Sequence, residues 1–311
     1  MPIKPHSGEA REHADNEFIT AVRMPHADEP ACSEAGYQRI ERLAALLSRS
    51  CHESYPAYSA IGLGGIFAQN KRSAPGRSRM RLGGSIDYKQ AKTRFMHRLV
   101  CAAAAAQPLN SIAEIGFAAG HTSLLMLEAA PSAHVATFDL GDAPWTTHQA
   151  QLLTAAYPGR FNFSFGPSQL TVPQHHTLEP TRRIELAFVD GAKAYTPRLL
   201  DILNLRPLAT PTATLLFDEI CTLGCANGTE PCADDCFNGA PKAYAHASHL
   251  GLIRVSECAW PPGFEQVDGI CGGHFLAPPG DRAGGTAAPA LSAEQESVRA
   301  RLDATLRSGG M

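Results

Sequence analysis

Three acidic side chains stand at the ends of two apolar segments, where they could act together on a ligand. The apolar run Ile184–Val189 is followed by Asp190, and the run Ala213–Phe217 is followed by Asp218 and Glu219. Both runs predict buried parallel strands, whose carboxyl ends face the ligand crevice of an open α/β sheet. Carboxylates gathered this closely need a cation to offset their charge, and either a divalent metal or a neighbouring lysine would provide it.

A glycine turn could hold the second ligand of such a site. The segment Ser111–Ser123 reads as a short apolar strand that meets Gly116 and Gly120 and then opens directly into a helix. Gly116 can take backbone angles closed to other residues, and the amides of a first helical turn carry partial positive charge. A dinucleotide turn needs a glycine where Ala118 stands, so a pyrophosphate would be crowded. The turn therefore favours another anionic or carboxylate-bearing cofactor.

The turn resembles motif I of the class I S-adenosylmethionine (SAM) dependent methyltransferases. Glu114 stands two positions before the first glycine, as the family's acidic residue does, and Ala118 replaces the asparagine of a related signature. The resemblance implies a seven-stranded Rossmann-like α/β fold, with a mostly parallel sheet and helices on both faces. It implies that Glu114 orients the methionine end of SAM. It implies cofactor contacts from Glu114, Gly116, Phe117, Ala118, Gly120, His121, Ser123, Asp139, Ser168 and Asp190.

Two later segments follow the same family plan in the right order. His134–Asp139 reads as a second strand that ends in an acid, and a carboxylate there can accept both ribose hydroxyls of the cofactor. Arg160–Gly166 reads as a third strand, and Ser168 follows where the family usually has Gly-Asp-Ser beside the adenine. Pro167 replaces that aspartate, which removes an acceptor for the adenine amino group.

The acidic residues resemble the site of the metal-assisted O-methyltransferases of the catechol type. That family has an aspartate followed three residues later by a lysine, then an acidic or Asp-Asn pair, at positions matched here by Asp190, Lys193, Asp218 and Glu219. The resemblance implies Mg²⁺ or another divalent cation on Asp190, Asp218 and Glu219. It also implies catalytic roles for Asp190 and for Lys193, the latter as a general base with a depressed pKa. The alternative is that the carboxylates only hydrogen-bond the cofactor amine and loop amides.

The expected reaction is in-line transfer of the sulfonium methyl of SAM to the hydroxyl of a small molecule. Two other classes stay open: a nicotinamide-dependent oxidoreductase, which the missing glycine disfavours, and a non-catalytic SAM-fold module that binds a partner. A net charge of −3 gives no basic excess for nucleic acid, and no apolar run approaches the roughly 18 residues of a membrane span. We expect a cytoplasmic protein, and the acceptor and the oligomeric state stay open.

Composition and helix signals divide the chain into four parts. We expect disorder over residues 1–33, a helical extension over 34–106, the methyltransferase domain over 107–280, and a linker with a terminal helix over 281–311. Glycine, arginine and serine fill a connector at 62–84. Ser292 and Gln295 have the spacing of a capping box that opens the terminal helix. Further helices are predicted over 34–50, 88–106, 122–130, 147–156, 197–205 and 240–250, and final strands over 251–257 and 273–277.

Cysteines gather in a loop over 221–238 that we expect to cover the active site. Six of the nine cysteines fall between Cys221 and Cys271. Zinc, disulfides and free thiols all stay open, although a zinc knuckle usually has closer pairs. Disulfides, together with the glycosylation sequon at Asn227, would point to a secretory lumen instead of the cytoplasm.

Overall fold

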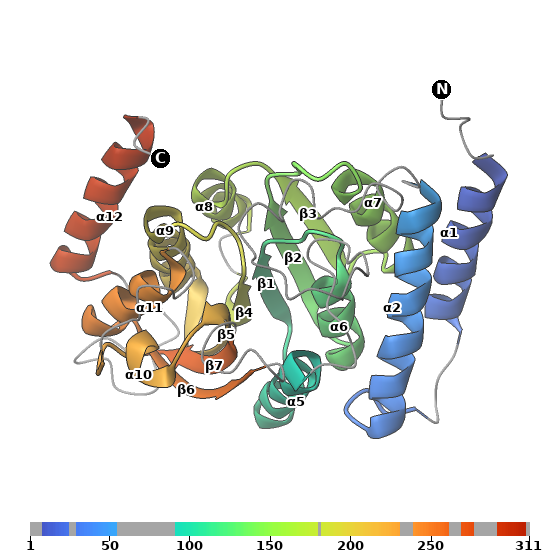
Figure 1. The fold of residues 1–311 in the computed structure, drawn as a ribbon, viewed down its shortest axis with the longest axis horizontal. Coiled ribbons are helices and arrows are strands. Elements are labelled where there is room, and N and C mark those ends of the chain that lie inside the picture. The colour runs from blue at the N-terminus through green and yellow to red at the C-terminus, as the bar shows by residue number, and fades with distance from the viewer. Residues whose placement is uncertain are drawn as a thin grey trace, which may run out of the picture.

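The computed structural model describes residues 8–24, 29–54, 91–179, 182–230, 239–260, 269–276 and 291–308. Within these ranges the chain builds one seven-stranded sheet in the order β3-β2-β1-β4-β5-β7-β6 (Figure 1). The strands are β1 (Ser111–Ile115), β2 (His134–Asp139), β3 (Phe161–Phe165), β4 (Ile184–Val189), β5 (Ala209–Ile220), β6 (Ile253–Ala259) and β7 (Gly269–Phe275). The strands β1 to β5 pair in parallel, whereas β7 runs antiparallel to both β5 and β6. The predicted fold class is confirmed.

Helices cover both faces of this sheet, and each face has its own core. The helices are α1 (Gly8–Arg23), α2 (Glu34–Ser54), α5 (Ala91–Ala106), α6 (His121–Ala129), α7 (Thr146–Ala156), α8 (Ser168–Leu178), α9 (Tyr195–Leu205), α10 (Leu223–Ala226), α11 (Ala240–His249) and α12 (Ala293–Arg307), with a short 3₁₀ turn at Arg206–Leu208. Side chains alternate between the faces, so Leu186 and Phe188 of β4 join the core under α5 and α6. Their neighbours Ala187 and Val189 join the core under α9 and α11. A turn at the end of β4 therefore lies between two firmly packed layers.

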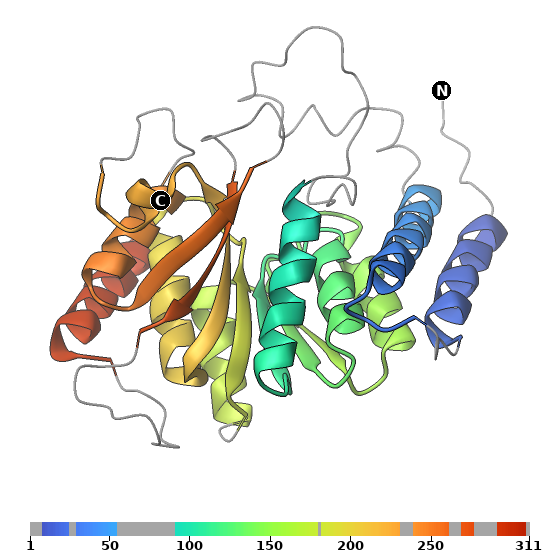
Figure 2. The same cartoon turned by 90° about the horizontal axis from the view of Figure 1, so that it is seen from below.

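The N-terminal segment corrects one expectation. The disorder predicted over residues 1–33 is wrong for Gly8–Arg23, which forms α1. The helix is polar along most of its length, but Ala14 and Phe18 lie four residues apart on one face and are buried. Phe18 joins the core beside α2, so two apolar residues suffice to fix the helix once α2 is present. Figures 1 and 2 show α1 and α2 side by side at the end of the molecule opposite to α12.

Most predicted elements have their expected positions within a few residues. The capping box is confirmed, because Ser292 accepts from the amide of Gln295 at 3.2 Å and the Gln295 side chain accepts from the amide of Ser292 at 2.8 Å. Helix α8 was not predicted. The connector at 62–84 and the second half of the loop 221–238 lie outside the described residues.

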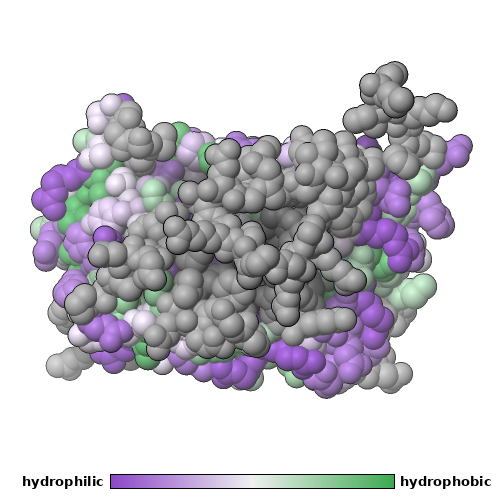
Figure 3. Space-filling model, in the orientation of Figure 1, coloured by the Kyte–Doolittle hydropathy of each residue, from purple (hydrophilic) through white to green (hydrophobic). Residues whose placement is uncertain are grey.

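The hydropathy of the described surface and helices agrees with the absence of long apolar runs in the sequence. Hydrophilic residues dominate the rim of the face drawn in Figure 3. No helix in the described ranges combines the length and the apolar character that crossing a bilayer requires.

Candidate active site

The glycine turn after β1 lies directly against the end of β4. Gly116 has φ of 95°, and a Cβ atom there would overlap the backbone carbonyl of Asp190. Ala118 has φ of 49°, a left-handed conformation that a non-glycine residue adopts at a cost, and Gly120 has φ of 80° at the start of α6. The turn is therefore shaped by a close backbone approach, which brings Asp190 beside the predicted cofactor cradle.

Asp139 at the end of β2 holds this turn in place. Its Oδ2 atom accepts from the amides of Phe117 at 2.7 Å and Ala118 at 3.2 Å, and its Oδ1 atom accepts from the amide of Gly141 at 2.7 Å. A carboxylate oxygen has two acceptor positions, so Oδ1 keeps one for a further donor. Asp139, the residue expected to bind ribose, thus also links the loop after β1 to the loop after β2 through hydrogen bonds.

Glu114 lies beneath the turn as a buried acid. Its side chain is 0% exposed and accepts hydrogen bonds from the hydroxyls of Ser123 and Thr137, the latter at 2.9 Å. Burial raises the pKa of Glu114 to about 8, although both hydroxyl donors lower it. Glu114 is therefore neutral at neutral pH. Ser123, predicted as a cofactor contact, serves here as a partner of Glu114.

Two other predicted cofactor residues have partners within the protein. His121 is 1% exposed, and its Nε2 atom lies 2.8 Å from the hydroxyl of Ser48 in α2. Ser168 at the start of α8 donates to Oδ1 of Asp201 in α9 at 2.6 Å. Burial raises the pKa of Asp201 to about 6. The structure brings Gly116, Asp139 and Asp190 together, while His121 faces a helix of the N-terminal extension.

The three predicted carboxylates gather at the ends of β4 and β5. The register pairs Val189 with Phe217, so Asp190 and Asp218 follow at neighbouring positions. Burial, and secondarily the negative charge of Asp218, raise the pKa of Asp190 well above its ordinary value. Glu219 has φ of 65°, a strained conformation at the end of its strand.

Cations of the protein itself face this acidic group. Asp218 forms an ion pair with Lys92 of α5, and Glu219 forms one with Lys193 and another with Arg198 at 3.2 Å. No group of three or more histidine, cysteine or acidic residues in the described ranges has the arrangement of a metal site. Asp218 and Glu219, two of the three predicted ligands, are paired with ammonium and guanidinium groups, so a divalent cation would have to compete with these ion pairs for its oxygen ligands.

Arg198 is the central residue that sequence reasoning missed. Its side chain is 0% exposed, and it ion-pairs with Glu219. Its other donors bind the carbonyls of Val189 at 2.6 Å, Ala192 at 3.0 Å and Gly191 at 3.3 Å, and the hydroxyl of Tyr244 at 2.9 Å. This guanidinium fixes the loop after β4, which carries Asp190 and Lys193. The one available signal was a charged residue inside the leucine-rich helix α9.

The surroundings of Lys193 raise its pKa, whereas the predicted general base would have a depressed pKa. Burial alone would lower its pKa, but the negative charges of Asp190 and Glu219 outweigh burial and raise it. Its side chain is about half exposed and carries a positive charge at neutral pH. The geometry therefore supports Lys193 as a fixed cation.

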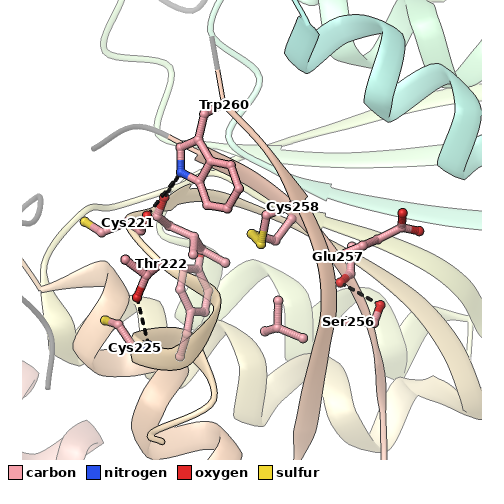
Figure 4. Close-up of a disulfide and its surroundings, with 12 residues drawn as sticks. Cys221, Thr222, Cys225, Ser256, Glu257, Cys258 and Trp260 are labelled. Atoms are coloured by element: carbon pink, nitrogen blue, oxygen red, sulfur yellow. Dashed lines mark hydrogen bonds between the residues drawn. A yellow bond between two sulfur atoms is a disulfide. The ribbon is translucent and has the colours of Figure 1, made fainter. Parts of the chain in front are cut away.

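The described cysteines other than Cys51 form disulfides. Cys258 of β6 is bonded to Cys271 of β7, Cys32 is bonded to Cys101 of α5, and Cys221 and Cys225 are disulfide-bonded as well. Figure 4 shows the indole of Trp260 next to the backbone of Cys221, with Cys225 on the helix that follows. That indole donates to the carbonyl of Cys221 at 3.1 Å. Disulfides, among the three open alternatives, are what the described cysteines of this loop form.

The glycosylation sequon has a structural use. The Asn227 amide donates to the carbonyl of Val255 at 2.8 Å and accepts from the amide of Val255 at 3.0 Å. Both ends of the side chain are thus bound to β6.

Comparison with known proteins gives a family for the centre of the chain. Residues 113–220 match the family model of a methyltransferase domain. No curated protein matches the chain at a significant level.

Solved structures give distant likenesses in addition. The O-methyltransferase TomG of Streptomyces achromogenes in complex with SAM is 18% identical, with a TM-score of 0.46 over 60% of this chain and 81% of its own. An O-methyltransferase of Bacillus cereus in complex with SAH is 12% identical, with a TM-score of 0.45 over 85% and 99%. The N-methyltransferase NodS of Bradyrhizobium japonicum is 14% identical, with a TM-score of 0.41 over 61% and 89%. These structures are therefore only distant likenesses, and the match of residues 113–220 to the methyltransferase-domain model is a separate finding.

Proposed function

We propose that this chain transfers the methyl group of SAM to a hydroxyl of a small molecule, and the match of residues 113–220 to a methyltransferase-domain family model supports this. The observation that carries the proposal is the contact between two halves of one site. The cofactor turn at Gly116 touches the backbone of Asp190, so a methyl donor on the turn would lie beside the charged groups at the ends of β4 and β5. SAM, when bound, supplies the electrophilic methyl group.

The proposed seat of SAM extends from the turn to the ends of β2 and β3. Gly116, Phe117, Ala118 and Gly120 would approach the cofactor through their backbone, and Asp139 would accept from the ribose with its remaining acceptor position. Leu140 and Phe165 are 55% and 52% exposed beside Asp139, and such apolar surfaces suit a flat base. Glu114 and Ser123 would support the turn from below, and Ser168 would border the base.

The charged groups would orient and activate the acceptor oxygen. A neutral hydroxyl is a poor nucleophile, so the site must favour its anion and align it with the methyl carbon and the sulfur. The ion pairs at Asp218 and Glu219 provide fixed charges for this purpose. Asp190 has no side-chain hydrogen bond within the described residues and would contact the cofactor or the acceptor. The divalent cation is left out of this proposal, because Asp218 and Glu219, two of its three expected ligands, are already paired with cations of the protein.

Binding of SAM to the Asp139 variants tests the cofactor half. We expect Asp139→Ala to weaken SAM binding roughly 10- to 100-fold, because hydrogen bonds to a charged group contribute about 1.5–3 kcal/mol. The neighbouring Asp142 is exposed, so Asp142→Ala is the matched control and should bind SAM like the wild type. Isothermal titration calorimetry measures both. Equal affinities in all three proteins would contradict the proposed seat.

Methyl transfer tests the catalytic half. Radiolabelled SAM and a panel of hydroxylated metabolites should give a labelled product with the wild-type chain. SAM binding without transfer to any acceptor would favour the alternative of a non-catalytic module, in which the internal partners of Asp139 and Glu219 serve structure alone.

The disulfides support an oxidising compartment over the cytoplasm, since reducing conditions rarely preserve such bonds. Cys51 is the free, buried thiol among the described cysteines, and burial raises its pKa to about 12. Alkylation of the unfolded, unreduced protein should modify Cys51 and spare Cys32, Cys101, Cys258 and Cys271. Modification of all five would contradict the assignment.

A further inference from the structure

The acidic group at the ends of β4 and β5 is balanced by an equal number of cations. Asp190, Asp218 and Glu219 face Lys92, Lys193 and Arg198. A divalent ion bound to Asp218 and Glu219 would have to displace three ion pairs and enter among three positive charges, which Coulomb repulsion opposes. The ammonium and guanidinium groups therefore offset the charge of the carboxylates, as a bound metal ion would.

The two lysines differ from Arg198 in what they offer a ligand. Arg198 is fully buried, and its three nitrogens are committed to Glu219, to Tyr244 and to three backbone carbonyls. An ammonium group has three donors that turn together about one bond, so it can share them between a carboxylate and a second oxygen. Lys92 and Lys193 can therefore donate to an acceptor oxygen while they keep their ion pairs with Asp218 and Glu219.

Lys92 comes from a part of the chain that the methyltransferase family model does not cover. It lies on α5, before the matched segment 113–220, and its side chain is 15% exposed against 17% for Asp218. Helix α5 packs in the same core as β4 and α6, which fixes the helix that presents this charge. Lys193 lies on the loop after β4, whose carbonyl at Ala192 accepts a hydrogen bond from Arg198. The lysines thus reach the carboxylates from two separate elements.

We propose that Lys92 and Lys193 bind the ionised oxygen of the acceptor in place of a divalent cation, so that the acceptors of this chain are acidic hydroxyls of the phenol type. The inference rests on the proposed methyl transfer. The acceptor releases its hydroxyl proton to water, and its oxygen forms the bond to the methyl carbon. The bond from sulfur to that carbon breaks, its electron pair returns to sulfur, and S-adenosylhomocysteine leaves. Fixed charges can favour a phenolate, whereas an alkyl alcohol is too weakly acidic to ionise by this means.

A chromogenic phenol measures this directly. The probe is 4-nitrophenol, whose anion absorbs visible light, added to the full chain with saturating S-adenosylhomocysteine and EDTA. An opposite charge within about 4–6 Å lowers the pKa of an acid by about 1–3. We therefore expect the absorbance titration of the bound probe to shift to lower pH by at least about 1, and Mg²⁺ in place of EDTA should add nothing.

Variants locate the effect. Lys92→Met and Lys193→Met should each reduce the shift in the probe's pKa and weaken phenolate binding about tenfold, while Lys92→Arg keeps the charge and most of the effect. Lys242 is an exposed lysine on α11, so Lys242→Met is the matched control with no expected change. Lys193 is half exposed, so its variant should fold even if Lys92→Met does not.

Three results would overturn the inference. A shift that appears only with Mg²⁺ would restore the metal, an absent shift in the wild type would remove the anion site, and a shift unchanged in both methionine variants would place it elsewhere. Calorimetry with SAM separates these from a failure of the proposed function, because each of them is compatible with intact SAM binding.

Discussion

The two halves of the site are built in different ways. The cofactor half consists of the turn after β1 and the end of β2, where Asp139 contacts backbone amides of residues 117, 118 and 141. The acceptor half unites Lys92, Lys193, Arg198 and Glu219, which come from α5, a loop, α9 and β5. The first half depends on backbone shape and the second on charge compensation. A local motif can therefore be intact in a chain whose chemistry is decided by residues far away in sequence.

Replacement of Arg198, the buried guanidinium of the acceptor half, should reduce the free energy of unfolding more than the other substitutions do. The cofactor half should stay intact. Arg198→Met would leave Glu219 buried beside the two other carboxylates with one cation fewer, at a cost of about 3–5 kcal/mol in the free energy of unfolding. Urea denaturation measures this. Arg182 forms a partly exposed ion pair with Glu179, and Arg182→Met should cost less than about 1 kcal/mol. Equal losses would mean that the acceptor half does not depend on charge compensation.

A methyl group on the turn should damage the cofactor half instead. Gly116→Ala places a Cβ atom against the Asp190 carbonyl in a left-handed conformation, which together cost about 2–5 kcal/mol and should reduce SAM affinity more than tenfold. Gly159 has φ of 75°, and a Cβ atom added there would have nothing within 4 Å, so Gly159→Ala carries only the conformational cost of about 1–2 kcal/mol. Denaturation and calorimetry compare the two. If Gly159→Ala lost SAM binding equally, the close approach at Gly116 would not be the cause.

The effect that is smallest at any one step of pH concerns Glu114, the acid beneath the turn. Glu114 is protonated in the folded chain up to a pKa of about 8 and ionised in the unfolded chain above about 4.5, so its contribution to stability decreases between these values. Glu114→Gln mimics the neutral acid and lacks this slope. Between pH 5 and 8 the variant should gain on the wild type by no more than about 1.4 kcal/mol per pH unit. Glu9 is exposed, and Glu9→Gln should leave the slope unchanged.

A matching slope in the wild type and Glu114→Gln would show that Glu114 is ionised in the folded chain. The acid would then be a charged part of the cofactor half. Urea denaturation at several pH values decides between these two descriptions.

Sequence reasoning reached the cofactor half because its signals are local. The strand, the glycines and Asp139 lie within 30 residues, and their types report their backbone requirements directly. It also located Asp190, Asp218 and Glu219 at strand ends, since buried parallel strands have continuous apolar runs.

Sequence reasoning could not identify the cations that pair with Asp218 and Glu219. Lys92 lies in a segment with no recognised motif, and Arg198 looked like one charge in an apolar helix, because only the three-dimensional fold brings both to β5. Helix α8 was missed because it contains Pro173 and mostly polar residues. Helix α1 was missed because Phe18 gains its stabilising contacts from α2.

The bond between Cys32 and Cys101 encloses 69 positions of sequence separation in a covalent ring that includes α2 and the start of α5. A protease that cuts the chain once inside this ring produces two fragments that stay joined through sulfur. The fragment with α1 and α2 would then migrate with the rest of the protein on a gel run without reductant, and separate from it after reduction. The segment of Cys32 thereby stays bonded to α5, the helix that carries Lys92, even in a nicked molecule.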